Sequence, residues 1–256
     1  MVTLHRKILG EGKPIVILHG LFGMLDNWVT LGKALAEHYK VILVDQRNHG
    51  NSPHTIDHDY SLMADDLLHM CNDEHLDRLI LIGHSMGAKT AMRFALDHPE
   101  KVDALIVIDM GVKTYSGGHE SIFRALRSLD LTAIASRKDA DEKLGEAIQD
   151  PAIRQFLMKN LHRTSEGGYS WKFNFEALYN HYGKILSNIA TEHPYPKGVA
   201  FIRGGHSGYI SDADWEGIQR VFPKAQLFTI PNAGHWVHAD QPAYLLELVN
   251  KVIAAS

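Results

Sequence analysis

The stretch Leu79-Ile-Leu-Ile-Gly-His-Ser-Met-Gly-Ala88 decides the fold. Its first four residues form a continuous apolar run, which is typical of a strand buried on both faces of a sheet. Residues 83–87 are a G-x-S-x-G sequence, and a helical pattern follows from Ala88. A strand, a sharp glycine-flanked turn and a helix are the setting of a nucleophile elbow. We therefore expect Ser85 to be a nucleophile; the alternative is a plain turn with an idle serine.

Further apolar runs lie on both sides of this stretch, and none alternates with polar residues. Each ends in a polar or glycine-rich turn, and ligands bind at the carboxyl ends of parallel strands. The predicted strands are 14–18, 41–44, 79–82, 105–108, 199–202 and 227–230, and the predicted helices are 31–38, 61–71, 88–98 and 244–254. This alternation predicts an α/β fold, with a mostly parallel central sheet flanked by helices.

Residues 115–189 break the alternation. They contain no convincing buried strand, and charged and apolar residues mix at helical spacing, as in 122–129 and 139–148. We interpret the chain as a single domain over residues 1–256, with a helical cap inserted at about 115–189. Long insertions commonly form lids over a site; the alternative is that this one only adds to the core. Its apolar residues either line a pocket or pack against the core. They are Ile122, Phe123, Leu126, Phe156, Leu157, Phe173 and Phe175.

Composition excludes several classes of protein. Among 256 residues, 26 are Lys or Arg and 30 are Asp or Glu, so the net charge is −4 and argues against a nucleic-acid partner. Cys71 is the only cysteine, which fits a reducing compartment. The N-terminus resembles no signal peptide, and no apolar run approaches the roughly 20 residues of a membrane span. We expect a cytoplasmic protein with no membrane span.

A serine hydroxyl becomes a good nucleophile when a base accepts its proton. Of the 17 histidines, His235 follows the last predicted strand and precedes the last helix, which places it at the same sheet edge as Ser85. His238 is the second candidate. His84 is the neighbour of the serine, so its side chain is expected to point elsewhere and to be structural.

The base in turn needs a carboxylate that fixes its tautomer and stabilises its cation. Two placements fit the chain order serine, acid, histidine. Asp109 ends the strand 105–108, and Asp212 and Asp214 follow the strand 199–202. The order of residues alone leaves both placements open.

Attack by a serine generates an oxyanion that needs backbone N–H donors. The N–H of Met86, directly after the serine, is one candidate. The second lies in His19-Gly-Leu-Phe-Gly23, directly after the strand 14–18. The glycines there allow the N–H of Leu21, or alternatively that of Phe22, to turn inward. We assign the oxyanion hole to Leu21 and Met86, against the alternative of an ordinary glycine turn.

Four motifs together resemble the α/β-hydrolase superfamily, and more closely its YbfF-like and ABHD11-like esterase branch. They are His19-Gly-Leu-Phe-Gly23, Asp45-Gln-Arg-Asn-His-Gly-Asn-Ser52, Gly83-His-Ser-Met-Gly87 and Ala233-Gly-His-Trp-Val-His238. The resemblance runs nearly end to end and is weakest in the insertion. It implies a carboxylic-ester hydrolase with no metal and no organic cofactor. The motif from Asp45 is expected to brace the turn at His19.

The resemblance also chooses the acid. Many α/β-hydrolases carry the Asp in the loop after the penultimate strand, where this chain has Ser207. YbfF-like proteins are similar to this chain in carrying an Asp after the strand that follows the elbow, and that position is Asp109. The resemblance further suggests that Trp236 forms a wall of the acyl site; the alternative is that its ring seals the loop. Phe22 is assigned with it to substrate binding.

We therefore expect two-step acyl transfer on small-molecule acyl esters, by default those with short acyl chains. Acyl-CoA thioesters are a second substrate class, because the same residues cleave them by the same route. Two rival functions remain. The first is another cofactor-free chemistry on this scaffold, namely that of a C–C bond hydrolase, a menaquinone-pathway lyase or a perhydrolase. The second is a non-catalytic ligand receptor.

Overall fold

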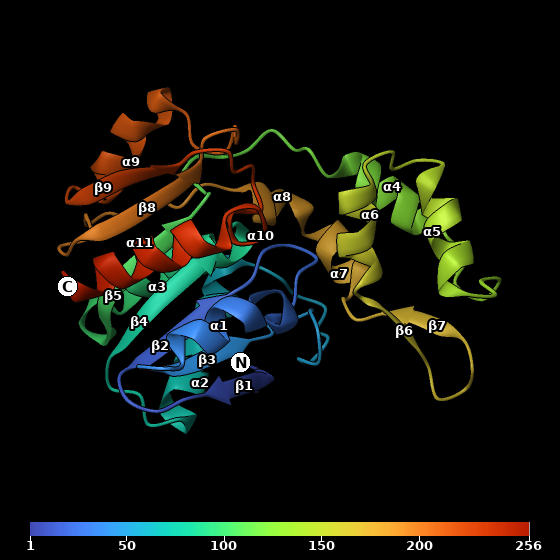
Figure 1. The fold of residues 1–256 in the computed structure, drawn as a ribbon, viewed down its shortest axis with the longest axis horizontal. Coiled ribbons are helices and arrows are strands. Elements are labelled where there is room, and N and C mark those ends of the chain that lie inside the picture. The colour runs from blue at the N-terminus through green and yellow to red at the C-terminus, as the bar shows by residue number, and fades with distance from the viewer. Residues whose placement is uncertain (256) are drawn as a thin grey trace.

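The centre of the protein is a seven-stranded sheet in the order β1-β3-β2-β4-β5-β8-β9, seen in a computed structural model that describes residues 1–255 (Figure 1). All neighbouring strands are parallel except β1 and β3, which pair antiparallel. The strands are β1 (Arg6–Leu9), β2 (Pro14–Leu18), β3 (Lys40–Val44), β4 (Leu79–His84), β5 (Val102–Ile108), β8 (Val199–Gly204) and β9 (Ala225–Ile230). The predicted mostly parallel sheet is confirmed.

Helices cover both faces of the sheet. One face packs against α1 (Val29–Leu35) and α11 (Pro242–Ala254), and the other against α2 (Tyr60–Asp73) and α3 (Met86–Asp97). The short helices α9 (Trp215–Val221) and α10 (Val237–Asp240) flank β9 in the sequence. All six predicted strands and four predicted helices are present, with ends that differ by no more than three residues.

The apolar run of β4 shows why the strands lack alternation. Leu79 and Leu81 lie in the core on the side of α2 and α3, whereas Ile80 and Ile82 lie in the core on the side of α1 and α11. Successive side chains of a strand point to opposite faces, so a sheet covered on both faces needs apolar residues at every position.

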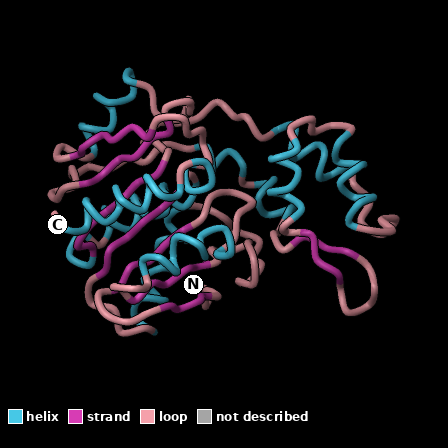
Figure 2. Tube along the Cα trace, viewed as in Figure 1, coloured by secondary structure: helices cyan, strands magenta, loops and turns pink. Residues whose placement is uncertain are grey.

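The segment between β5 and β8 lies to one side of the sheet (Figures 1 and 2). It contains α4 (Glu120–Ser128), α5 (Arg137–Gly145), α6 (Pro151–Met158), α7 (Phe175–Asn180) and α8 (Tyr182–Leu186). Its two ends run beside each other, because Tyr115 N donates to Leu186 O at 2.9 Å and Ile189 N donates to Val112 O at 2.8 Å. The segment therefore leaves and re-enters the main body at one place.

Two β elements were not predicted from the sequence. The edge strand β1 is half exposed and carries Arg6 and Lys7, so it lacks the apolar run of the other strands. Within 115–189, where no buried strand was expected, the structure has a small, largely unburied antiparallel hairpin of β6 (Leu161–Arg163) and β7 (Tyr169–Trp171). Each strand of this hairpin has three residues, too few for a periodic pattern.

None of the helices in residues 1–255 has both the length and the apolar character that a membrane crossing requires.

Candidate active site

Ser85 occupies a strained turn between β4 and α3. Its φ is 53° and its ψ −120°, in a region that non-glycine residues rarely adopt. The turn is also crowded. A Cβ at Gly83 would lie 2.3 Å from the carbonyl oxygen of Gly87, and a Cβ at Gly87 would lie 2.5 Å from that of Leu18. Both flanking positions therefore require glycine, and the strand–turn–helix setting predicted for Ser85 is confirmed.

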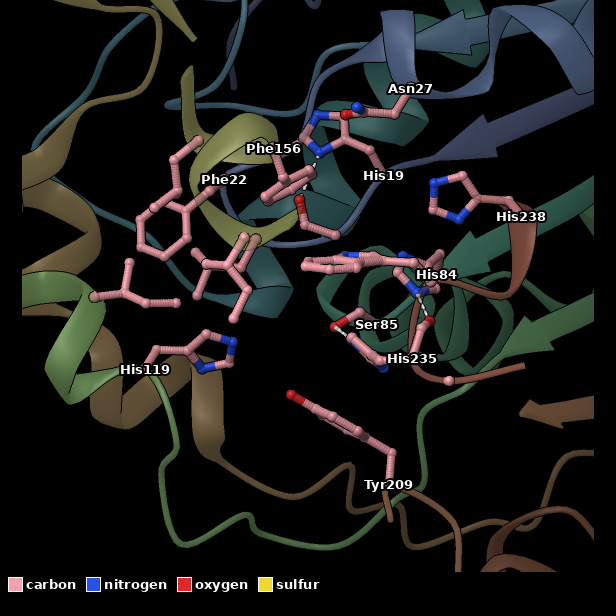
Figure 3. Close-up of a pocket in the computed structure, with 18 of the residues that line it drawn as sticks. His19, Phe22, Asn27, His84, Ser85, His119, Phe156, Tyr209, His235 and His238 are labelled. Carbon is pink, nitrogen blue, oxygen red and sulfur yellow. Dashed lines mark hydrogen bonds between the residues drawn. The ribbon is translucent and has the colours of Figure 1, made fainter. Parts of the chain in front are cut away.

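Ser85, His235 and Asp109 form one hydrogen-bonded chain. His235 Nε2 lies 3.0 Å from Ser85 Oγ (Figure 3). On the other side of the ring, His235 Nδ1 lies 2.7 Å from Asp109 Oδ2. Ser85 follows β4, Asp109 follows β5, and His235 lies between β9 and α10. The carboxyl ends of parallel strands thus bring together residues up to 150 positions apart. In the neutral ring, Nδ1–H donates to the carboxylate and leaves Nε2 to accept the serine proton.

Asp109 is fully buried and has further donors. Its Oδ1 accepts the Gly204 N–H at 3.1 Å, and its Oδ2 accepts the hydroxyl of Ser207. Bonds from several donors stabilise a buried carboxylate in its charged form. Ser207 stands where the resemblance places the acid of many other α/β-hydrolases, and here it donates to the carboxylate that follows β5.

The alternative acids and bases have other partners. Asp212 Oδ1 lies 2.6 Å from Arg203 Nη1, and its side chain is 88% exposed. Asp214 binds Lys113 Nζ at 2.7 Å. His238 stacks on Trp28 with ring centroids 4.3 Å apart. None of these side chains has a hydrogen bond to His235 or Ser85 within residues 1–255.

His84 lines the same cavity as Ser85 and lies beside His235, with ring centroids 4.8 Å apart, so its side chain does not point away from the site as expected. Its Nε2–H donates to the backbone oxygen of His235 at 2.8 Å and so helps to fix the loop that carries the histidine.

The turn after β2 lies against Ser85. A Cβ at Gly20 would approach the Ser85 Cβ to 3.0 Å. Phe22 N–H already donates to His49 Nε2 at 3.2 Å, so it is engaged. In the part of the chain that the structure describes, no protein acceptor bonds the N–H of Leu21 or that of Met86. These two donors are therefore available to a bound oxygen.

The Asp45 motif braces this turn, as predicted. Asp45 Oδ1 accepts the N–H of Leu25 at 2.7 Å, and Gln46 Nε2 donates to His19 O at 2.6 Å. The Arg47 side chain points away from Ser85, because its guanidinium is buried against Asp66, with Arg47 Nε 2.6 Å from Asp66 Oδ2. The motif thus holds the position of the turn through buried polar contacts.

Two buried histidines hold the same turn in their neutral form. His19 Nε2 accepts the N–H of Gln46 at 3.1 Å, and His49 Nε2 accepts the N–H of Phe22. In each ring Nδ1–H donates to a nearby backbone oxygen. Burial lowers the pKa of both rings, and that of His49 lies well below its ordinary value. Protonation of Nε2 would remove an acceptor from a backbone N–H.

From these rings and from further buried or half-buried histidines, we predict that the protein loses stability in mild acid. Burial lowers the pKa of His58 to about 3, and those of His119 and His238 to about 4. Since the folded pKa values lie below the unfolded value of about 6.5, the unfolded chain binds protons first as the pH falls. The contribution of these rings to stability is complete above pH ~6.5. It falls by up to about 1.4 kcal/mol per pH unit for each ring between pH ~6.5 and the folded pKa of that ring.

Urea unfolding at about pH 7.5 and about pH 5 measures this effect. We expect the free energy of unfolding to fall between the two, and His58→Gln to reduce the slope. His193→Gln, at an exposed position, is the matched control and should keep the wild-type slope. Equal stability at both pH values would contradict the neutral assignment of the buried rings.

A cavity of about 350 Å³ opens on Ser85 and His235. Trp236 lines it and packs against Phe156 with ring centroids 5.4 Å apart. Phe22 also lines it, although its side chain is 1% exposed. The insertion supplies Gly118, His119, Ile122, Asp150, Ile153, Phe156 and Leu157. Of the apolar residues considered from the sequence, Phe123, Leu126 and Phe173 pack in the core instead.

Tyr209 is a site residue that sequence reasoning missed. Its ring stacks on His235, with centroids 3.8 Å apart and planes 13° apart, and it faces the cavity (Figure 3). It lies in the loop after β8, two residues beyond Ser207, and no motif marks it.

No group of three or more His, Cys, Asp or Glu side chains within residues 1–255 is arranged to hold a metal ion.

Comparison with known proteins agrees with this architecture. Residues 13–242 match the family model described as alpha/beta hydrolase fold. The chain is 39% identical over 248 residues to the sn-1-specific diacylglycerol lipase ABHD11 of Mus musculus, covering 94% of this chain and 80% of that protein. It is 33% identical to the esterase YbfF of Escherichia coli K12, covering 95% of this chain and 94% of that protein. A solved structure titled marine microorganism esterase superposes with a TM-score of 0.97 at 39% identity, covering 98% of this chain and 100% of that one.

Proposed function

Because this chain belongs to the α/β-hydrolase fold family, in its ABHD11- and YbfF-like branch, and is an ester hydrolase, we propose that it acts through a covalent acyl-enzyme on Ser85. Ser85, His235 and Asp109 are its catalytic triad. The observation that carries the proposal is the hydrogen-bonded chain from Asp109 through His235 to Ser85, which opens on the cavity.

In the first step, His235 Nε2 accepts the proton of Ser85 as the hydroxyl oxygen attacks the ester carbonyl carbon. The imidazolium that forms is stabilised by the buried Asp109 carboxylate. The tetrahedral intermediate collapses, the bond to the alcohol oxygen breaks, and His235 returns the proton to that oxygen. The alcohol leaves, and the acyl group stays on Ser85.

In the second step, water replaces the alcohol. His235 accepts a proton from the water as its oxygen attacks the acyl carbon, and then returns that proton to Ser85 Oγ as the acid leaves. In both steps the N–H groups of Leu21 and Met86 donate to the oxyanion. Their lack of protein acceptors supports this role, because a donor already engaged would gain less from the developing charge.

The insertion at about 115–189 acts as a cap on the same domain. Seven of its residues line the cavity that contains Ser85, and its two ends leave the main body side by side. A cap excludes water from the reacting ester, which strengthens the electrostatic contacts in the site. Trp236 and Phe22 supply apolar contacts to the substrate from the main body.

A series of p-nitrophenyl esters from acetate to palmitate, run beside an acyl-CoA series, tests the proposed substrate class. We expect the highest kcat/KM for short oxygen esters, because the described cavity of about 350 Å³ is at the low end for small-molecule sites. A preference for long acyl-CoA would mean that the substrates are thioesters and not short oxygen esters. No turnover of either series would contradict the proposed function.

A further inference from the structure

A second cavity also borders Ser85, and most of its lining residues differ from those of the large one. It has a volume of about 20 Å³, against about 350 Å³ for the first. A space of this size holds roughly one water-sized group. Leu21, Ser85, His119 and Tyr209 line both cavities, so the two spaces meet at the nucleophile. We refer to them as the large chamber and the side compartment.

The residues that the two spaces do not share distinguish them chemically. His235 and Trp236 line the large chamber and not the side compartment. Met86 and Met110 line the side compartment and not the large chamber. His235, which protonates the leaving alcohol, therefore faces the large chamber and not the side compartment.

The tetrahedral intermediate must place four groups around one carbon. Ser85 Oγ is one, and the oxyanion at the N–H groups of Leu21 and Met86 is the second. The oxygen of the leaving alcohol must reach His235 Nε2 to receive its proton, so the alcohol extends into the large chamber. The acyl substituent is the fourth group, and the side compartment is the space that remains beside the oxyanion donors.

On the basis of the proposed function, we propose that the side compartment takes the acyl substituent and the large chamber takes the alcohol. The preferred substrates are then esters of acetyl-sized acids with larger apolar alcohols. The large chamber suits such alcohols, because its walls include Ile122, Ile153, Phe156 and Leu157. A longer acyl chain would have to share the large chamber with the alcohol.

The wall of the side compartment is held by hydrogen bonds. The Tyr115 hydroxyl donates to Tyr209 O at 2.8 Å and accepts the N–H of Gly111 at 2.7 Å. The Tyr60 hydroxyl donates to Ile185 O at 2.6 Å. The bonds to Tyr209 and Ile185 join segments 94 and 125 positions apart, so the compartment resists enlargement.

Lys89 supports the wall from behind. Its side chain is fully buried, and its amino group lies 4.9 Å from the ring centre of Tyr115 and 5.8 Å from that of Tyr60. The amino group also donates to the backbone oxygens of Lys113 and Leu186 at 3.0 and 3.3 Å. Both aromatic walls are thereby fixed to the two ends of the insertion.

Two isomeric esters test the assignment in the wild-type protein. Hexyl acetate and ethyl hexanoate have the same atoms and differ in which side of the ester carries the long chain. We expect kcat/KM for hexyl acetate to exceed that for ethyl hexanoate by about tenfold or more, since each misplaced methylene costs a factor of roughly ten in a fitted pocket. Equal rates, or a preference for ethyl hexanoate, would overturn the proposal.

Ile185→Ala should enlarge the side compartment. Ile185 lines the side compartment and not the large chamber. Its backbone oxygen accepts the bond from the Tyr60 hydroxyl, so this bond does not depend on the Ile185 side chain. We expect the ratio of ethyl hexanoate to hexyl acetate turnover to rise by about tenfold. Ile189→Ala is the matched control, because Ile189 is similarly buried in the same segment and lines neither space. Its ratio should stay at the wild-type value.

These measurements distinguish a failure of the compartment assignment from a failure of the proposed function. A ratio that moves equally in Ile185→Ala and Ile189→Ala, or in neither, would overturn the compartment assignment while ester hydrolysis stands. A wild-type protein that hydrolyses no ester of either series would overturn the proposed function itself. Because the isomer comparison needs no variant, it decides the assignment even where Ile185→Ala fails to fold.

Discussion

Ser85→Ala is expected to lower kcat for ester hydrolysis by at least about four orders of magnitude, the scale of loss when a catalytic serine is removed. The substitution removes the oxygen that forms the acyl bond, and His235 and Asp109 then have no nucleophile to activate. The residual rate would come from the oxyanion donors and from substrate binding alone. Hydrolysis of p-nitrophenyl acetate, with far-UV circular dichroism as the check on folding, measures the effect.

Ser121→Ala is the matched control for the loss of a serine hydroxyl. Ser121 is exposed on α4, so its replacement should leave kcat unchanged. A Ser85→Ala protein that is folded and retains activity within about tenfold of wild type would refute the nucleophile assignment, because triad losses are far larger.

Asp109→Asn is expected to lower kcat by about 10⁴-fold, the effect known for removing the charge of a triad acid. The amide keeps the shape of the side chain and can still accept from Gly204 N. It cannot stabilise the imidazolium, and its N–H₂ group favours the tautomer of His235 in which Nδ1 is the acceptor and Nε2 carries the proton. That tautomer cannot accept the proton of Ser85.

Asp212→Asn is the control that separates the two acid placements. Asp212 pairs with Arg203 at the surface, so its replacement should change kcat by less than about twofold, as is usual for exposed ion pairs. The kcat values of both variants on one short ester, measured at the same pH, decide the matter. A larger loss in Asp212→Asn than in Asp109→Asn would assign the acid to the loop after β8.

The strands and the nucleophile turn could be predicted because local chemistry determines them. Residues 79–82 must be apolar at every position in a sheet covered on both faces, and Gly83 and Gly87 must lack a Cβ for the turn to close. His235 could be selected among 17 histidines because its place after the last strand puts it at the edge that Ser85 occupies.

Other features depend on contacts between distant segments, which no local pattern encodes. The bond from Ser207 to Asp109 joins residues 98 positions apart. The stacking of Tyr209 on His235 joins two loops that follow different strands. The order serine, acid, histidine left Asp109, Asp212 and Asp214 open. The resemblance favoured Asp109, and in the structure Asp109 is the one of the three that bonds His235.

The short β elements could not be predicted for a different reason. A three-residue strand such as β6 or β7 shows no period, and β1 is half exposed at the edge of the sheet. The side compartment is also invisible in the sequence. It arises where Met110, after β5, meets Ile185, from the far end of the insertion.

The most direct test of the account is to trap the acyl-enzyme. The protein is mixed with p-nitrophenyl acetate, quenched in acid within one turnover, digested and mapped by mass spectrometry. We expect an acetyl group on the peptide that contains Ser85, and none on the same peptide of Ser85→Ala. Rapid ester turnover with an unlabelled Ser85 peptide, or with the acetyl group on another side chain, would contradict it.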